Sequence, residues 1–240
     1  MNKGNIQNVI INHSSYSIIK DNENSCILSL HNMSYASGNI LYQSIIRTHE
    51  NTLGFIDPIK KELHFRICSH VYNLLDFFKT KGRISYLQCM LMIGFLSKQI
   101  KQLEEMNYCL LGFDLEDIIV IDDYIFVFVN NKYLLPFDKY EYNKDRVVSL
   151  LAPIKKPYFS SPELIEITKI PTQIHYKSSY YSLASLVIYF LLDEYMFKGN
   201  EVKTDEDIET ILRPIHCTKM YWFLKRCLVS SPAKRVLLFI

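Results

Sequence analysis

Histidine and cysteine are the side chains in this chain best able to bind a metal or act as a nucleophile, and their spacing predicts neither role. The sequence has seven His and six Cys, with no Cys-x-x-Cys pair and no zinc-site spacing. His216 and Cys217 are adjacent but lack companions, which is typical of a surface pair. The chain also lacks the Gly-x-Ser-x-Gly turn of hydrolases and the Gly-x-x-x-x-Gly-Lys loop that binds phosphate.

The elements that must position any site fall into two unequal parts. The first part, residues 1–68, has no strong helical period and contains β-rich pieces separated by Asn, Asp and Ser. We expect strands at residues 9–11, 16–20, 26–31, 52–56 and 63–69, with one helix at residues 39–47.

Helices dominate the second part, with one β-hairpin at residues 118–129 in its middle. Ser85 is the expected N-cap of a long helix, and Gly82 ends the helix before it. We expect helices at residues 71–79, 85–106, 162–168, 179–194, 205–212 and 218–228, and irregular chain at 132–156. The long helix should bury one face, made of Leu87, Leu91, Phe95, Ile100 and Leu103. This order predicts an α+β protein with a hinge near residues 69–71.

Two motifs in the second part resemble those of protein kinases. Pro162 and Glu163 lie in Ser-Ser-Pro-Glu, which resembles the Ala-Pro-Glu end of an activation segment. Ser182 lies in Tyr-Ser-Leu-Ala, which resembles the Trp-Ser-Leu-Gly start of the buried central helix. The order of predicted elements is also similar to the kinase order. The resemblance implies a small, β-rich N-lobe at residues 1–69 and a larger helical C-lobe at 70–240, with the final helix trimmed or completed by a partner.

The resemblance also implies that the catalytic loop is degenerate. Where kinases have His-Arg-Asp-Leu-Lys-Pro-Glu-Asn, residues 110–117 are Leu-Leu-Gly-Phe-Asp-Leu-Glu-Asp. The Asp that accepts the substrate proton becomes Gly112, the phosphate-steadying Lys becomes Asp114, and the metal-binding Asn becomes Asp117. Asn130 replaces the metal-binding Asp of Asp-Phe-Gly. A two-residue deletion would instead align Asp114 with the catalytic Asp.

The phosphate-binding residues of a kinase N-lobe have no counterparts in the first part of the chain. Residues 1–37 contain a single glycine, Gly4, so there is no Gly-rich loop. The predicted strand at 26–31 has no Lys, and the predicted helix at 39–47 has no acidic residue. We therefore expect neither ATP nor Mg²⁺ as a cofactor.

Residues that hold a kinase C-lobe together are nevertheless present. In kinases the Glu of Ala-Pro-Glu pairs with a buried Arg, and the stretch at residues 227–235 resembles the one that carries it. The resemblance therefore implies an ion pair between Glu163 and Arg235. The kinase Asp that ties the central helix to the catalytic loop becomes Ser179, which implies a loop without that restraint.

This pattern predicts a catalytically inactive pseudokinase that binds or scaffolds other proteins. One alternative is a divergent, weakly active kinase that transfers phosphate to Ser, Thr or Tyr through Asp114 and Asp117, with Asp122 or Asp123. If these carboxylates have no catalytic role, they are the solvated side chains of a hairpin turn. The second alternative is an unrelated α+β interaction protein.

Composition limits the partners and the compartment. Apolar residues make up 49% and charged residues 22% of the chain, and the net charge is +2, which does not favour nucleic acid. No apolar run reaches the ~18 residues of a spanning helix, so we expect no membrane insertion and a cytoplasmic protein. Four cysteines in apolar runs are expected to be buried, reduced thiols: Cys26, Cys68, Cys89 and Cys227.

The composition of the chain also gives an indication of its source. Asn, Ile, Lys and Tyr are abundant, which is typical of an AT-rich genome. Together with the small N-lobe, this usage resembles the kinase-related proteins of large DNA viruses. That resemblance implies a location in the host cytoplasm or the virion.

Overall fold

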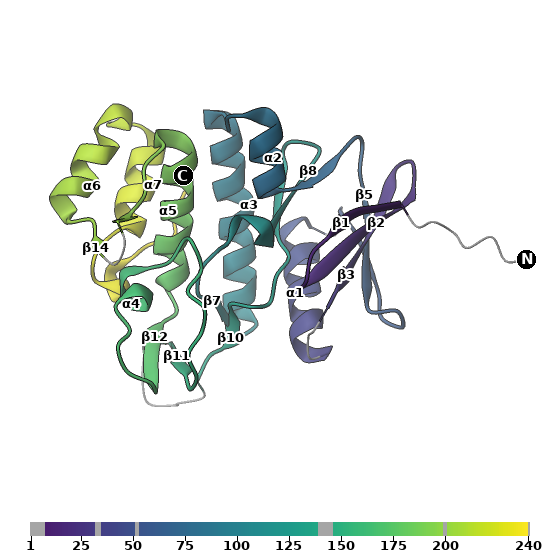
Figure 1. Cartoon of the computed structure of the whole chain (residues 1–240), viewed down its shortest axis with the longest axis horizontal. Coiled ribbons are helices and arrows are strands. Elements are labelled where there is room, and N and C mark those ends of the chain that lie inside the picture. Colours follow the sequence, from purple (N-terminus) through teal and green to yellow (C-terminus); the bar gives the residue numbers. More distant parts are fainter. Residues whose placement is uncertain (1–7, 32–34, 51–52, 139–145, 199–200, 240) are drawn as a thin grey trace, which may run out of the picture.

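The computed structural model describes residues 8–31, 35–50, 53–138, 146–198 and 201–239. An antiparallel sheet forms the N-terminal part, and helices form most of the C-terminal part (Figure 1). The predicted α+β class is therefore confirmed.

The N-terminal sheet has five strands in the order β1-β2-β3-β5-β4. Tyr16 and Ile18 on β2 are buried and alternate with partly buried neighbours, as the two-residue period of a strand requires. The helix α1 (Tyr35–Thr48) packs beside the sheet and also against α3. The strands are β1 (Asn8–Asn12), β2 (Tyr16–Asn22), β3 (Ser25–Leu30), β4 (Gly54–Asp57) and β5 (Glu62–Arg66). Each of the five overlaps an expected strand, although β5 ends three residues before the end of the strand expected at 63–69.

A short strand, and not a helix, follows the connection after β5. Residues Val71–Asn73 form β6, which pairs with β8 (Ile118–Ile121) of the predicted hairpin, whose other strand is β9 (Ile125–Phe128). The helix expected from residue 71 begins three residues later, as α2 (Leu74–Lys81). Asn73 caps α2 by accepting a hydrogen bond from the Asp76 N–H at 2.8 Å.

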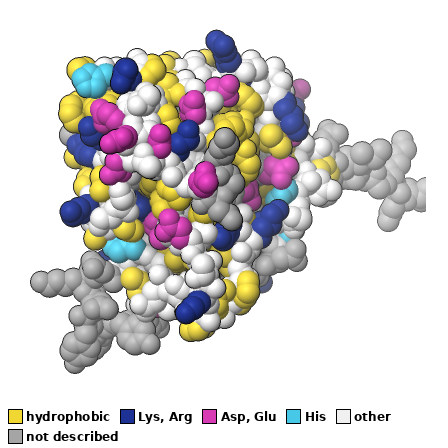
Figure 2. Space-filling view, turned by 60° about the vertical axis from the view of Figure 1, so that its left-hand side comes forward, with side chains coloured by type: hydrophobic (Ala, Val, Ile, Leu, Met, Phe, Trp, Pro, Cys, Tyr) yellow, Lys and Arg dark blue, Asp and Glu magenta, His cyan; other side chains and the backbone are white. Residues whose placement is uncertain are grey.

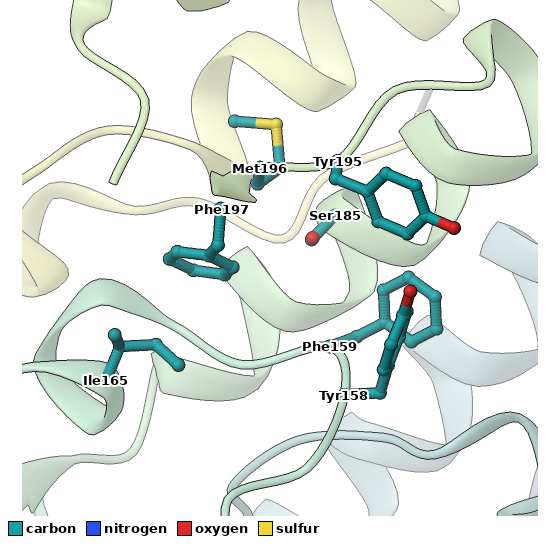
Figure 3. A pocket seen from close by; sticks show the side chains of 7 residues that line it. All are labelled: Tyr158, Phe159, Ile165, Ser185, Tyr195, Met196 and Phe197. Atoms are coloured by element: carbon teal, nitrogen blue, oxygen red, sulfur yellow. The ribbon is translucent and has the colours of Figure 1, made fainter. Parts of the chain in front are cut away.

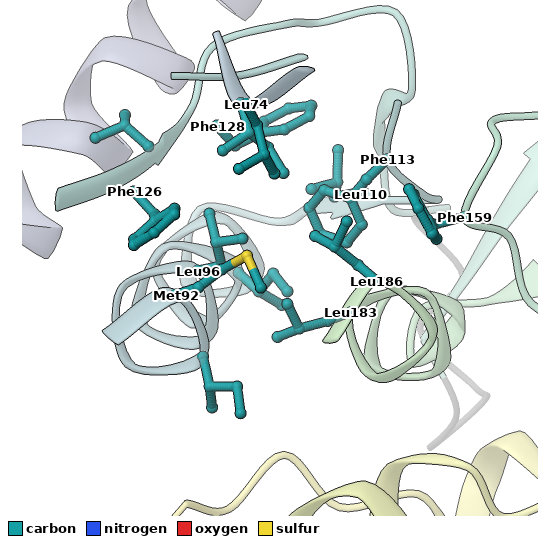
Figure 4. Packing of buried hydrophobic residues seen from close by; sticks show 14 of the residues in the cluster. Leu74, Met92, Leu96, Leu110, Phe113, Phe126, Phe128, Phe159, Leu183 and Leu186 are labelled. Atoms are coloured by element: carbon teal, nitrogen blue, oxygen red, sulfur yellow. The ribbon is translucent and has the colours of Figure 1, made fainter. Parts of the chain in front are cut away.

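The long helix α3 (Tyr86–Glu105) begins as expected, because Ser85 and Gln88 form a reciprocal capping box. Its buried face differs in part from the predicted one. Ile100 and Leu103 are buried, but the Leu87 side chain is 57% exposed. Figure 4 shows Met92 and Leu96 of α3 facing side chains of α2, β9 and α5.

The rest of the chain builds on α5 (Ser178–Leu192), which is buried along nearly its whole length. Two short strand pairs lie nearby, so the stretch expected to be irregular contains β10 and β11. The remaining elements are β7 (Tyr108–Leu110), β10 (Leu134–Pro136), β11 (Val147–Leu150), α4 (Pro162–Ile165), β12 (Thr172–His175), β13 (Phe197–Lys198), β14 (Glu201–Val202), α6 (Asp205–Leu212) and α7 (Lys219–Cys227). Among the described residues, no helix combines the length and the apolar character needed to cross a bilayer.

The cysteines match the prediction in three of four cases. Cys26, Cys89 and Cys227 are buried free thiols. Cys68 is exposed, because it lies in the surface connection after β5. Cys109, which was not among the four, is also buried, and burial raises the pKa of its thiol well above the ordinary value.

Candidate functional site

Residues 110–117, here called the central loop, lie between two other segments of the chain. The Leu111 N–H donates to the Tyr133 carbonyl oxygen at 3.0 Å. Phe113 and Phe159 exchange two backbone hydrogen bonds of 3.1 and 2.9 Å. The loop is therefore held on one side by the chain after β9 and on the other by the chain before α4.

Gly112 has no room for a side chain. A Cβ atom built on this residue would lie 2.4 Å from Cγ of Pro157 and 2.6 Å from the carbonyl oxygen of Phe159. Both distances are far below van der Waals contact, and the second is to backbone that is fixed by its bonds to Phe113. Residue 112 thus has no space for a carboxylate side chain.

Both carboxylate oxygens of Asp114 are engaged by neighbouring groups. Oδ1 accepts a hydrogen bond from the Tyr158 N–H at 2.6 Å, and Oδ2 accepts one from the Tyr133 hydroxyl at 2.9 Å. The Lys132 ammonium group lies 3.6 Å from Oδ2. Asp114 therefore joins the segments on the two sides of the central loop.

Asp117 is buried and forms a pair with Asn130. Its Oδ1 accepts a hydrogen bond from the Asn130 side-chain amide, and its Oδ2 accepts one from the Asp114 N–H at 3.0 Å. Asn130 Oδ1 in turn accepts from the Lys132 N–H at 3.0 Å. Burial raises the pKa of Asp117 from its ordinary value to about 6, although the bond from Asn130 opposes the shift.

The pairing of Asp117 with Asn130 leads to a testable prediction. Asn130→Asp would place a second carboxylate against Asp117 inside the protein, and one of the two must lose its charge. We expect a loss of about 3 kcal/mol in the free energy of unfolding at pH 8, equivalent to roughly two pKa units, and a smaller loss at pH 5. The exchanged double variant, Asp117→Asn with Asn130→Asp, should recover most of the stability. Urea unfolding of the wild type and of the two variants measures this, and a double variant as unstable as Asn130→Asp would contradict the pairing.

The raised pKa of Asp117 determines how the stability of the wild-type protein changes with pH. The folded state binds the Asp117 proton more tightly than the unfolded chain, because the pKa is raised on folding. The contribution of this group to stability is therefore present at low pH and is lost as pH rises between 3.8 and about 6. In the Asp117→Asn variant, the free energy of unfolding measured with urea should depend less on pH over this interval.

Asp122 and Asp123 are not part of this site. They form the turn at the other end of β8, about 13 Å along the strand from Asp117. Asp122 accepts hydrogen bonds from the N–H groups of residues 68–70 at 2.7–3.2 Å. Burial opposes the shift, but these bonds hold the pKa of Asp122 below its ordinary range. Asp123 pairs with Lys81 at 2.7 Å, so both carboxylates have structural partners.

The start of α5 restrains the central loop, which contradicts the expectation drawn from Ser179. Ser179 donates to the nearby Tyr176 carbonyl and does not reach the loop. Ser178 and Ser182 instead each place Oγ 3.2 Å from the Leu111 carbonyl oxygen, as donors. The helix begins one residue earlier than expected, and its first two turns direct these two hydroxyls at the loop.

The predicted ion pair between Glu163 and Arg235 is confirmed. The Arg235 guanidinium donates to the two carboxylate oxygens of Glu163 at 2.6 and 2.9 Å, which is the strong bidentate geometry. Arg235 is fully buried and also donates Nε to the Val229 carbonyl at 2.9 Å. Pro162 is the first residue of α4 and positions Glu163 in its first turn.

Three further residues of the site were not predicted from the sequence. Tyr16 on β2 is fully buried and donates its hydroxyl hydrogen to the Glu116 carbonyl at 2.7 Å, which joins the N-terminal sheet to the central loop. Tyr133 and Ser178 are the others. Each acts through a contact far away in the sequence, so no local pattern could have identified it. The sequence is rich in Tyr from Tyr133 to Tyr142, which could have drawn attention to Tyr133, and residues 139–142 of this stretch lie outside the described residues.

The central loop is thus a junction of structural hydrogen bonds. Across residues 8–31, 35–50, 53–138, 146–198 and 201–239, no group of three or more His, Cys, Asp or Glu side chains could hold a metal ion. No protein-family model matches this chain, and no curated protein matches it closely enough to be a relative.

Proposed function

We propose that this chain is a degenerate member of the protein-kinase-like fold that binds other proteins and performs no phosphoryl transfer. The order of elements supports this proposal: a sheet, a connecting segment, helices, a loop and hairpin, then more helices. The bidentate pair of Glu163 and Arg235 supports it as well, since it joins the Ser-Ser-Pro-Glu motif to the stretch at residues 227–235, and both resemble kinase sequences. In these terms residues 1–69 are the N-lobe and residues 70–240 the C-lobe.

The packing at Gly112 is the observation that carries the proposal. Phosphoryl transfer in kinases needs a carboxylate that accepts the proton of the substrate hydroxyl. Pro157 and the Phe159 carbonyl occupy the space that such a side chain would need. The chain before α4 therefore lies where a base and a substrate hydroxyl would have to meet.

The two aligned metal-ligand positions support the same conclusion. Asp117 and Asn130 are the residue types that kinases use there, but in the opposite order. Their side chains bond to each other, and the second oxygen of Asp117 accepts from the Asp114 N–H. The weakly active kinase that uses Asp114 and Asp117 is disfavoured, because all four carboxylate oxygens already accept hydrogen bonds.

Surface features support a protein partner. An apolar groove of about 320 Å³ runs along α3 and is lined by Leu87, Met90, Leu91, Gly94, Phe95, Lys98 and Phe239. On the face in Figure 2, basic side chains are interspersed with acidic ones, and apolar side chains lie between them. Such a mixed surface favours proteins over nucleic acid. A viral source and the host cytoplasm remain part of the proposal on composition alone.

A nucleotide titration tests the proposal. ATP that bound with a Kd 100-fold below its concentration would stabilise the chain by about 2.7 kcal/mol and raise its melting temperature by several degrees. We expect no change in melting temperature with millimolar ATP and Mg²⁺. A saturable increase that requires Mg²⁺, and that Asp117→Asn removes, would contradict the inactive assignment.

A further inference from the structure

A cavity of about 400 Å³ opens between α5 and the segment before α4 (Figure 3). Tyr158 and Phe159 before α4 line it, together with Ile165 at the end of α4, Ser185 within α5, and residues 195–197 after α5. Its volume is in the range of sites that bind small ligands. None of the roles described above uses it.

The cavity has aromatic walls. Tyr158 and Tyr195 are 56% and 43% exposed, and their ring centroids lie 5.8 Å apart at the rim. Phe159 and Met196 are buried behind them, and Phe197 lies opposite (Figure 3). Aromatic rings attract a further ring by edge-to-face or offset contacts, and the methionine sulfur adds a favourable contact. These walls therefore favour a flat aromatic group.

The Ser185 hydroxyl lines this largely apolar cavity, in addition to the hydroxyls of Tyr158 and Tyr195 at its rim. Ser185 is only 3% exposed, and its hydroxyl makes no hydrogen bond with any residue that the structure describes. Ser178, Ser179 and Ser182 on the same helix all donate to carbonyl oxygens. Figure 3 shows the Ser185 oxygen pointing between the rings. A hydroxyl that lines an apolar cavity can form a hydrogen bond with a polar group on a bound ring, which adds to the apolar contacts.

We propose that this cavity binds an aromatic ring with a hydrogen-bonding group on its edge, that is, a phenol or an indole. The ring packs between the aromatic walls, and Ser185 Oγ is its polar partner. Tyr or Trp side chains of a protein carry such rings, as do free phenols and indoles. The inference goes beyond the proposed function, because it holds whether or not the chain transfers phosphate.

Two probes that differ by one hydroxyl test the site. p-Cresol and toluene have the same ring and methyl group, and NMR titration of the labelled full chain gives both affinities. The wild-type chain should bind p-cresol about 3- to 10-fold more tightly, the worth of one hydrogen bond. Ser185→Ala should reverse the preference, because the phenol hydroxyl then enters an apolar cavity without a partner. Ser97→Ala, at a buried and equally unpaired serine of α3, is the matched control and should bind as the wild type does.

A peptide arm distinguishes the two sources of the ring. Gly-Gly-Tyr-Gly-Gly binding at least as tightly as p-cresol would assign the site to a protein side chain, and weaker binding would assign it to a free ring. Shifts should centre on the amides of Ser185 and residues 195–197. Equal affinities for p-cresol and toluene in the wild type, an unchanged preference in Ser185→Ala, or no binding at millimolar probe would each overturn the proposal.

Discussion

Replacing Arg235 with alanine is expected to lower the free energy of unfolding by about 3–5 kcal/mol. The guanidinium is fully buried and makes a bidentate pair with Glu163, so its removal leaves the carboxylate without its cation. The same change also empties the space beside the Tyr181 ring, which lies 5.1 Å from the guanidinium carbon. Urea unfolding followed by circular dichroism measures the loss.

Arg213→Ala is the matched control for this change. Arg213 is exposed at the end of α6, so the same substitution there should alter stability by less than about 0.5 kcal/mol. Glu163→Gln keeps the shape of the side chain but removes its charge. It should lower the free energy of unfolding by less than Arg235→Ala does. If Arg235→Ala were as stable as Arg213→Ala, the junction between α4 and the chain end would not contribute to stability.

Gly112→Asp, which supplies the carboxylate that a kinase has at the aligned position, is expected to destabilise the protein by about 3 kcal/mol or more. Overpacking alone costs about 1–3 kcal/mol, and a buried unpaired carboxylate adds to that. The new Cβ would meet Pro157 at 2.4 Å and the Phe159 backbone at 2.6 Å, so the segment before α4 must move. The variant should also show no gain in phosphoryl transfer.

Alanine variants isolate the steric part of this effect. Gly112→Ala adds only the clashing Cβ and should still destabilise by about 1–3 kcal/mol. Gly94→Ala adds a Cβ on α3 that meets no atom within 4 Å, and should stabilise by up to about 1 kcal/mol through helix propensity. Equal effects of the two alanine substitutions would mean that the space at Gly112 is open.

Local sequence patterns predicted the elements well where the signal lies within the element itself. Ser85 and Gln88 fix the start of α3 through contacts only three residues apart. The Glu163–Arg235 pair was also predictable although its partners lie far apart in sequence, since the two motifs around it share one resemblance.

The errors arose where tertiary contacts decide the outcome. Val71–Asn73 suits either a helix or a strand, and its pairing with β8 selects the strand. The helix α3 is apolar on more than one side, so its sequence could not show that Leu87 would be the exposed one. At Gly112 the deciding contact is with Pro157, whose approach depends on the whole chain between them.

The most direct test of the central claim measures phosphate transfer from ATP labelled at its γ-phosphate. The purified chain would be incubated with Mg²⁺, the labelled ATP and peptides that contain Ser, Thr and Tyr. A variant with both Asp114→Asn and Asp117→Asn is the control, because it removes the carboxylates of the alternative kinase assignment. We predict that the wild-type chain incorporates no more label into itself or the peptides than this variant does. Incorporation by the wild type that the variant loses would contradict the account.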